Sequence, residues 1–286
     1  MRYGHFVRGI TTAYEHRGGI KTLRLGTLKP DWFEQIQGEC SWIIKQAESS
    51  DVTAKDHVTN WTRPSGSVRQ FSLFNMSGDS ADTEGDYGYL GDAKRKKLVF
   101  PQLEGLRRFT NLFGPALRNL RLNGMGTKSA LNAHEESSIT LTGTGKQYIT
   151  RFHLPIFTNK SALVYLDDES FHFAEGNLYF FHHGCVHAAS NSGTEPRYHL
   201  VFDCFLDRDL FKRVFPGSAS PDSGFSKTNA AAASMRGEPF HFPNFVREDH
   251  RVIEGAINYG RAAPSVIEYY RKNYPSLFRM LPRHAS

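Results

Sequence analysis

Residues 176–206 read GNLYFFHHGCVHAASNSGTEPRYHLVFDCFL. Short runs rich in aromatic and β-branched residues lie at 177–181, 186–190 and 198–206, and turn residues separate them. Runs of this length and composition are typical of strands in an antiparallel sheet. The segment therefore predicts a turn, a strand, a turn and a strand that return along one another.

The same pattern extends in both directions along the chain. Further candidate strands lie at 69–74, 117–122, 130–133, 138–141, 147–155, 162–166 and 170–173. Many short, aromatic-rich strands between turn signals are typical of a sandwich or barrel. We therefore predict a mainly β fold with flanking helices, built on a double-stranded β-helix core of the jelly-roll, cupin-like type.

Helical patterns flank this core. We expect short helices from Pro30 to Ile36 and from Cys40 to Ala47, and a third over 101–113, where apolar residues recur at helical spacing after a proline. Residues 1–30 show little period and predict a strand with a flexible arm. A Ser-, Ala- and Gly-rich loop at 216–236 precedes two predicted C-terminal helices at 247–259 and 264–274.

These elements predict a single catalytic unit in three parts. Residues 1–68 form a helical or irregular segment packed on the core, residues 69–206 form the β-helix core, and residues 207–286 form a loop and a helical segment. At 286 residues, the chain is long enough for one large domain.

Composition narrows the class of protein. Hydrophobic residues make up 39% and charged residues 22% of the chain, as in ordinary globular proteins. The formal charge is +6, but the basic residues are dispersed, so we expect no nucleic-acid partner. No apolar run is long enough for a membrane span, and three cysteines are too few for a disulfide framework. We therefore expect a cytoplasmic protein without a membrane partner.

A metal site is predicted from three residues. His134 and Glu136 are two apart, and on an extended chain such residues share one face, whereas Glu135 points away. His187, far along the chain, supplies a third ligand. Two imidazoles and one carboxylate suit non-haem Fe(II) and leave coordination positions open for O₂ and a co-substrate. Glu135 stays open as a minor alternative for the carboxylate.

Positive charge is predicted close to this site. Arg197 lies ten residues after His187, near the start of an apolar strand, and its guanidinium can bind a carboxylate through two parallel hydrogen bonds. Arg151 and His153 share one face of another strand. Burying them is costly unless they meet an anion, which is either a ligand carboxylate or a nearby Asp or Glu of the chain. Asn191 is either a turn residue or a contact of the site.

These motifs together resemble the aspartyl/asparaginyl β-hydroxylase family, a family of Fe(II)/2-oxoglutarate dioxygenases. The resemblance covers residues 70–205 and is strongest to bacterial proline 3-hydroxylases, which share a tract like Leu73–Ser80. The matching motifs, in chain order, are His134-x-Glu136, Arg151-x-His153, Glu175-Gly176, His187-x-x-x-Asn191 and Arg197. The family's usual carboxylate ligand is Asp, so Glu136 is a departure, one methylene longer.

The resemblance implies a function. It implies that Fe(II) binds His134, Glu136 and His187, that Arg197 holds the distal carboxylate of 2-oxoglutarate, and that Arg151 and His153 contact 2-oxoglutarate or the substrate. The predicted reaction is hydroxylation of a free L-amino acid, proline-like or otherwise small, or of an amino-acid derivative.

Two alternatives stay open beside that prediction. The substrate residue could be tethered to a peptide or a carrier protein in natural-product biosynthesis. The chain could also be a non-catalytic jelly-roll or cupin module that binds a metal. The sequence leaves the oligomeric state open, a homodimer included.

Overall fold

The computed structural model describes residues 1–14, 19–49, 55–56, 62–63, 68–82, 96–134, 136, 139–142, 145–166, 169–185, 187–215, 225–227 and 272. For residues 12–14, 55–56, 62–63, 132–134, 139–142, 145–146 and 225–227 it describes the backbone alone. The predicted loop at 216–236, except for 225–227, and the two predicted C-terminal helices, except for residue 272, lie outside the described residues.

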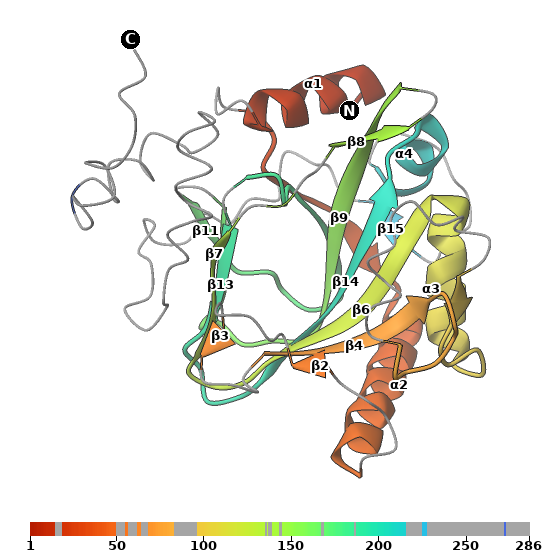
Figure 1. Ribbon diagram of the computed structural model, residues 1–286, viewed down its shortest axis with the longest axis vertical. Coiled ribbons are helices and arrows are strands. Elements are labelled where there is room, and N and C mark those ends of the chain that lie inside the picture. Colours follow the sequence, from red (N-terminus) through yellow and green to blue (C-terminus); the bar gives the residue numbers. More distant parts are fainter. Residues whose placement is uncertain are drawn as a thin grey trace.

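Two antiparallel sheets form the body of the described part of the chain (Figure 1). The larger sheet has the strand order β15-β1-β12-β9-β14-β6-β4-β2, with β5 on β4 and β8 on β9. Its strands are β1 (Thr22–Leu28), β2 (Lys55–Asp56), β4 (Val68–Asn75), β5 (Lys97–Leu98), β6 (Leu117–Met125), β8 (Ile139–Thr142), β9 (Gly145–Phe157), β12 (Asn177–Phe181), β14 (Arg197–Phe205) and β15 (Phe225–Lys227). The smaller sheet has the order β11-β10-β13-β7-β3. Its strands are β3 (Thr62–Arg63), β7 (Ser129–His134), β10 (Ala162–Leu166), β11 (Glu169–Phe171) and β13 (His187–Asn191).

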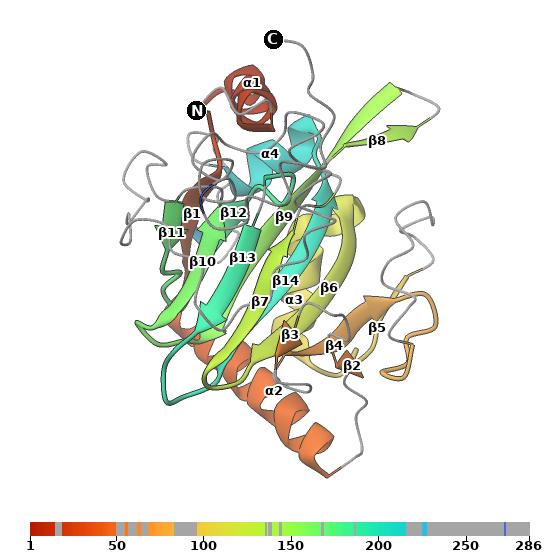
Figure 2. The ribbon, with the colours of Figure 1, turned by 60° about the vertical axis from the view of Figure 1, so that its left-hand side comes forward.

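The chain passes back and forth between the two sheets. Strands β6, β9, β12 and β14 belong to the larger sheet, and β7, β10 and β13, which come between them in sequence, belong to the smaller one. In Figures 1 and 2 the two sheets face each other across an interior. This is the jelly-roll, cupin-like arrangement, so the predicted fold class is confirmed.

Helices cover the outer face of the larger sheet. They are α1 (Tyr3–Tyr14), α2 (Pro30–Glu48), α3 (Glu104–Phe113) and α4 (Arg208–Val214). Phe109 and Phe113 of α3 pack on Phe202 of β14, with ring centroids 5.2 and 4.5 Å apart, respectively. This outer core is large and aromatic, so it fixes the larger sheet as a rigid platform.

The N-terminal segment differs from its prediction. Residues 3–14 form helix α1, which the sequence did not predict because Gly4 and Gly9 lower helix propensity. Packing outweighs that cost, since Phe6 is fully buried against Phe180 of β12 and Phe215. Strand β1 then lies inside the larger sheet, between β12 and β15.

The prediction of two short helices at 30–36 and 40–47 is wrong. Residues 30–48 form one helix, α2, because Ile36, Cys40 and Ile43 make one continuous buried stripe. Gly38 lies within this helix, where a Cβ would meet no atom within 4 Å. The helix predicted from residue 101 begins at Glu104.

A glycine turn closes the larger sheet beside β12. Gly176 has φ +71, a conformation that strongly favours glycine, and the sequence placed a Glu-Gly turn here. Its N–H donates to the carbonyl of Pro155, and its own carbonyl accepts from the N–H of Leu28. The turn thus ties the ends of β1, β9 and β12 together.

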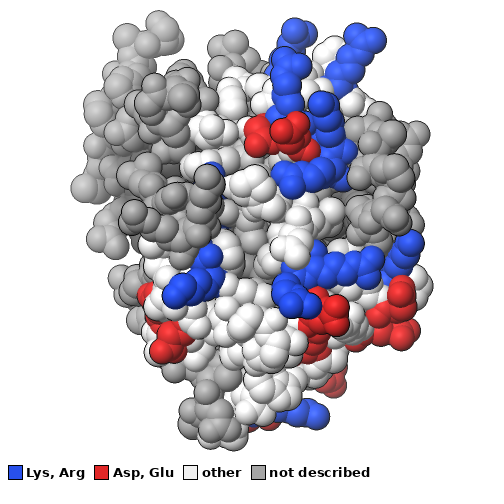
Figure 3. Space-filling model, turned by 90° about the vertical axis from the view of Figure 1, so that its right-hand side faces the viewer, with Lys and Arg blue, Asp and Glu red and all other residues white. Residues whose placement is uncertain are grey.

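The three cysteines are buried, and none of them is in a disulfide. Cys185 lies in the apolar cluster between the sheets, where it packs as a small apolar side chain. Among the described helices, none has the length and apolar character needed to cross a membrane. On the face seen in Figure 3, Lys and Arg side chains lie beside Asp and Glu rather than in one uninterrupted field.

Candidate active site

Alternation along β9 and β14 lines the interior with polar residues. On β14, Tyr198, Leu200 and Phe202 point to the helices, and the residues between them point between the sheets. The inward set on β14 is Arg197, His199, Val201 and Asp203; on β9 it includes Arg151 and His153. Because β9 and β14 are neighbours, with Asp203 paired to Arg151, these side chains form one inner surface.

The two predicted histidine ligands lie opposite each other. In the register of β13 and β7, His187 is the direct partner of His134. Directly opposed residues of an antiparallel pair are the closest positions on neighbouring strands. The backbone therefore brings together two residues 53 positions apart (187 − 134), as a shared metal requires.

The ring of His187 is oriented for metal binding. Its Nδ1 lies 2.9 Å from the carbonyl oxygen of Cys185, and because a carbonyl only accepts, Nδ1 carries the proton. Nε2 then carries the lone pair. A backbone carbonyl behind the imidazole is the usual way in which proteins fix the tautomer of a metal-binding histidine.

Glu136 faces that lone pair. Its Oε1 lies 3.7 Å from Nε2 of His187, and its own N–H donates to the carbonyl of His183. Ligand atoms bound about 2 Å from one ion lie roughly 3 to 4 Å apart, so this pair fits one metal. No cluster of three metal-binding side chains occurs among those described, a set that excludes the side chain of His134. Glu135, the alternative carboxylate, is outside the described residues.

Arg151 is held between two carboxylates. Nη1 and Nη2 donate to the two oxygens of Glu136 at 2.6 and 2.8 Å. Nε and Nη2 donate to the two oxygens of Asp203 at 2.7 and 3.1 Å. Of the two partners that the sequence left open for Arg151, the structure has the carboxylates of the chain.

Asp203 is the centre of this group, which we call the carboxylate cluster: Asn119, Arg121, Glu136, Arg151 and Asp203. Asp203 is fully buried and accepts further hydrogen bonds from Asn119 at 2.7 Å and from Arg121 at 3.1 Å. Burial opposes its charge, but the two guanidinium groups outweigh burial and lower its pKa. The paired carboxylates likewise raise the pKa of Arg151 against the effect of burial.

A second buried group lies toward the start of β14, and we call it the guanidinium cluster: His153, Arg197 and His199. Nη1 of Arg197 lies 2.9 Å from Nδ1 of His199, and that nitrogen lies 3.4 Å from Nδ1 of His153. Arg197 is 6% exposed. Three nitrogens of the cluster are buried without a hydrogen-bond partner among the described residues: Nε of Arg197 and Nε2 of each histidine.

Within the part of the chain that the structure describes, no carboxylate balances the guanidinium cluster. Burial alone lowers the pKa of Arg197 to about 10, and the group stays charged at neutral pH. Burial and the nearby Arg197 also hold the pKa of His153 and of His199 well below the usual range, so both rings are neutral. One net positive charge is thus enclosed beside orphaned polar nitrogens, which is the arrangement that a bound anion completes.

Aromatic side chains connect this cluster to the metal position. The ring of Phe181 lies 4.8 Å from His153 and 5.1 Å from His187. Phe173 stacks with His199 at 6.5 Å, and it belongs with Phe181 to the apolar cluster between the sheets. Apolar walls with a few convergent polar groups are typical of small-molecule sites.

Asn191, which the sequence left open as a turn residue or a contact of the site, belongs to the scaffold. Its amide is occupied by loop contacts, since Nδ2 donates to carbonyls of Met125, Gly126 and Glu195 and Oδ1 accepts from Gly193. The structure therefore favours the turn residue over the cofactor contact. His182 likewise serves the scaffold, because its Nε2 donates to the carbonyl of Ile10.

The sequence did not identify His199 or Asp203 as members of the two clusters. Both lie at even spacing from Arg197 on the same strand, so strand periodicity could have placed them on the inner face. Nothing in that spacing identifies their partners.

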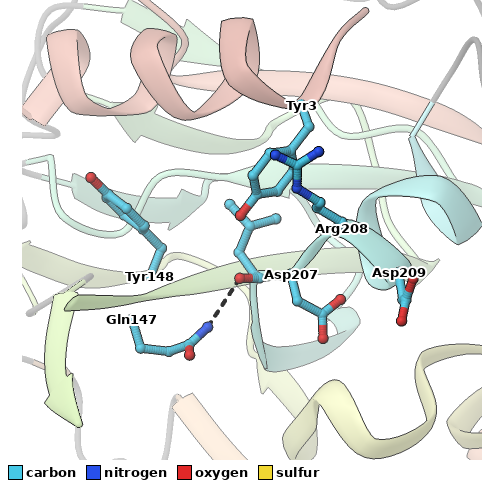
Figure 4. A pocket seen from close by; sticks show the side chains of 7 residues that line it. Tyr3, Gln147, Tyr148, Asp207, Arg208 and Asp209 are labelled. Atoms are coloured by element: carbon cyan, nitrogen blue, oxygen red, sulfur yellow. Dashed lines mark hydrogen bonds between the residues drawn. The ribbon is translucent and has the colours of Figure 1, made fainter. Parts of the chain in front are cut away.

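A separate pocket lies at the far end of β14. It has a volume of about 580 Å³ and is lined by Tyr3, Gln147, Tyr148 and residues 206–209. Figure 4 shows that Gln147 is bonded to the Leu206 carbonyl there, at 3.0 Å. Asp207 caps helix α4 by accepting from the N–H of Leu210. These groups serve the scaffold, and Arg197 lies at the opposite end of the strand.

Comparison with solved structures finds distant likenesses. AviO1 from Streptomyces viridochromogenes Tue57 aligns with a TM-score of 0.41 and 10% identity, over 77% of this chain and 99% of its own. A Pseudomonas putida prolyl-4-hydroxylase aligns with a TM-score of 0.36 and 10% identity, over 71% and 99%. The epimerase SnoN from nogalamycin biosynthesis aligns with a TM-score of 0.43 and 11% identity, over 86% and 100%.

The comparison with models of protein families gives a match over residues 34–206. No curated protein matches the sequence. The family model described as aspartyl/asparaginyl beta-hydroxylase matches residues 34–206, which include both clusters and the three predicted metal ligands. The chain therefore belongs to the aspartyl/asparaginyl beta-hydroxylase family, and with it to the oxygenase-type hydroxylases that use Fe(II) and 2-oxoglutarate.

Proposed function

We propose that the protein hydroxylates an unactivated carbon of a free L-amino acid, proline-like or otherwise small, or of an amino-acid derivative. The observation that carries this proposal is the guanidinium cluster: a buried, uncompensated Arg197 with two neutral histidines, one aromatic ring away from the metal position. A site that binds only a metal needs no such anion pocket. The non-catalytic cupin alternative leaves this enclosed charge without a purpose.

His134, Glu136 and His187 are the residues that would hold the metal. When bound there, Fe(II) supplies the oxidising chemistry that consumes O₂ and 2-oxoglutarate, releases succinate and CO₂ and leaves a hydroxyl group on the substrate. The chain's part is to position the reactants and to exclude water. His187 contributes a fixed tautomer through the Cys185 carbonyl, and Glu136 contributes a carboxylate whose place Arg151 fixes.

Arg197 would bind the distal carboxylate of 2-oxoglutarate. Its Nε is free to donate. Nδ1 of His199 accepts from Arg197, so Nε2 of that neutral ring carries the proton and is free to donate as well. This ring adds a donor without adding charge, so a single carboxylate neutralises the cluster. Phe173 and Phe181 keep water from competing with these hydrogen bonds.

The substrate class comes from the resemblance to proline 3-hydroxylases. In the tract Leu73–Ser80, which carries that resemblance, Asn75 organises a tight turn by accepting from the N–H of Gly78 and donating to the carbonyls of Asp79 and Asp82. Hydroxylation of a peptide- or carrier-tethered residue is the second reading within the class. The three buried cysteines are in no disulfide, which agrees with a cytoplasmic setting that also stays a proposal.

The test is an anaerobic titration followed by a substrate screen. Fe(II) with 2-oxoglutarate should give a weak visible charge-transfer band, and admission of O₂ with the right amino acid should release succinate and add one oxygen atom to the product. Glu136→Ala should lose the coupled turnover, whereas Glu34→Ala, on the exposed face of α2, should retain it. Full activity of Glu136→Ala, or no succinate with any amino acid, peptide or carrier-bound residue, would reject the assignment.

A further inference from the structure

The carboxylate of Glu136 is held in place by hydrogen bonds from Arg151. Both of its oxygens accept from Arg151, at 2.6 and 2.8 Å, while Oε1 also lies 3.7 Å from the lone pair of His187. The Glu136 side chain is 34% exposed, but the Arg151 side chain is only 7% exposed. A partly exposed ligand is thus anchored by a buried cation.

Arg151 is itself immobilised by Asp203. Two hydrogen bonds join them on neighbouring strands, and Asn119 and Arg121 hold Asp203 from the other side. The N–H of Asp203 also donates to the amide oxygen of Asn119, at 2.9 Å. Every member beyond Glu136 sits on β6, β9 or β14, the rigid strands that the aromatic outer core supports.

A glutamate at this position needs such support more than an aspartate would. It has one more rotatable bond, so a free glutamate spreads its carboxylate over more positions and loses more entropy when it binds a metal. A two-pronged contact with a planar guanidinium fixes both the position and the plane of the carboxylate. Arg151 removes the freedom that the extra methylene adds.

We propose that Asp203 and Arg151 form a positioning relay that presents Oε1 of Glu136 to the metal. Arg151 is then a positioning residue that acts through Glu136, and Asp203 acts through Arg151. The proposal rests on the proposed function in one respect, the assignment of Glu136 as a ligand. It departs from the role that the resemblance implies for Arg151, because its guanidinium is already shared by two carboxylates and is not open to 2-oxoglutarate.

The experiment measures Mn(II) affinity by calorimetry without 2-oxoglutarate, so that no turnover enters the result. Wild type is compared with Glu136→Ala, Arg151→Gln, Arg151→Lys and Arg121→Gln. Loss of a residue that orients a metal ligand typically weakens metal binding by about 10- to 100-fold, and we expect this of Arg151→Gln. Arg151→Lys should lose less, because it keeps the charge but not the fork.

Arg121→Gln is the matched control. It removes a buried arginine that also bonds to Asp203, whereas the two-pronged contact with Glu136 belongs to Arg151. A merely structural effect would weaken Mn(II) binding equally in Arg121→Gln and Arg151→Gln. The relay predicts a drop in Mn(II) affinity that is at least severalfold greater for Arg151→Gln.

The outcomes separate the relay from the function beneath it. If Glu136→Ala binds Mn(II) as wild type does, the ligand assignment fails and the proposed function fails with it. If Mn(II) binding depends on Glu136 but Arg151→Gln matches wild type, the relay alone is overturned. Should Arg151→Gln not fold, Arg151→Lys and Asp203→Asn decide: unchanged affinity in both overturns the relay, and weaker affinity supports it.

Discussion

The carboxylate cluster and the guanidinium cluster lie on the inner face of one sheet, yet their charges are handled in opposite ways. Around Asp203, two guanidinium groups meet two carboxylates and each charge has a partner. Around Arg197, one guanidinium meets two neutral imidazoles, and three nitrogens lack partners among the described residues. A buried cluster whose charges compensate one another holds its own side chains in place. A buried cluster with an uncompensated charge needs a ligand of opposite charge to complete its hydrogen bonds.

The largest expected effect is the loss of the balanced cluster's central charge. Asp203→Asn leaves Arg121 and Arg151 facing each other with one carboxylate fewer. Breaking a buried ion pair by removing one partner costs about 3 to 5 kcal/mol of unfolding free energy, and we expect a cost near the lower value because Asn119 and the amide remain. Urea unfolding at pH 7 measures this.

Acid should reveal the same charge in the wild type. The folded pKa of Asp203 lies below its unfolded value, so its contribution to stability is present above about pH 4 and declines as the pH falls further toward the folded value. Asp203→Asn should lack this loss below pH 4. A cost under about 1 kcal/mol at pH 7 would mean that the cluster is not held by charge pairing.

The next effect comes from completing the unbalanced cluster. With Mn(II) present, 2-oxoglutarate at 100 times its dissociation constant should stabilise the fold by about 2.7 kcal/mol, since it binds the native state alone. Arg197→Met should lose this stabilisation at the same concentration. Arg107→Met, which removes a positive charge from the exposed surface of α3, should keep it. Chemical unfolding with and without 2-oxoglutarate measures both, and equal stabilisation of Arg197→Met and wild type would remove Arg197 from the anion site.

Mild acid should destabilise the guanidinium cluster before it affects the carboxylate cluster. Burial and Arg197 lower the folded pKa of His199 well below 6.5, and His153 behaves alike beside Arg197, Arg151 and His187. Below pH 6.5 the unfolded state therefore binds protons that the folded state refuses, and stability falls as pH falls. Each histidine should cost about 2 kcal/mol between pH 7.5 and pH 5.

His199→Asn tests this pH dependence. Its unfolding free energy should fall by about 2 kcal/mol less than that of wild type over the same pH interval. Because the comparison is a difference between two pH values, any constant cost of losing the hydrogen bond to Arg197 cancels. The same fall in both proteins would show that His199 is protonated in the folded state.

The sequence could predict faces but not partners. Strand periodicity placed Arg151 with His153 on one face of β9, because that period is local and strict. The sequence also brought His187 and His134 together, because the predicted metal-binding motif joins two expected strands that lie far apart in the sequence. The bond from Arg151 to Asp203 joins residues 52 positions apart, and no spacing rule distinguishes Asp203 from any other carboxylate as its partner.

The errors in the helices have a related cause. Helix α1 has weak propensity and exists because Phe6 fills a place against Phe180 that only the folded sheet creates. Likewise Asn191 belongs to the predicted motif, but its amide forms hydrogen bonds with the loop at 193–195. Local signals decide what an element is, and tertiary packing decides what its polar atoms meet.

The smallest expected effect separates the two clusters most clearly, because loss of an arginine should change the unfolding free energy in opposite directions in the two clusters. Without ligand, Arg197→Met should leave stability unchanged or raise it by about 1 kcal/mol, since replacing an unpaired buried charge with an apolar side chain of similar length removes a desolvation cost. Arg151→Met should instead lower stability, because it removes one of the two guanidinium partners of Asp203 and the guanidinium that binds both oxygens of Glu136. Unfolding of both variants in ligand-free buffer gives the two signs. If the unfolding free energy of Arg197→Met fell by several kcal/mol, the Arg197 guanidinium would be stabilising the fold, as that of Arg151 does, and would not be there to bind an anion.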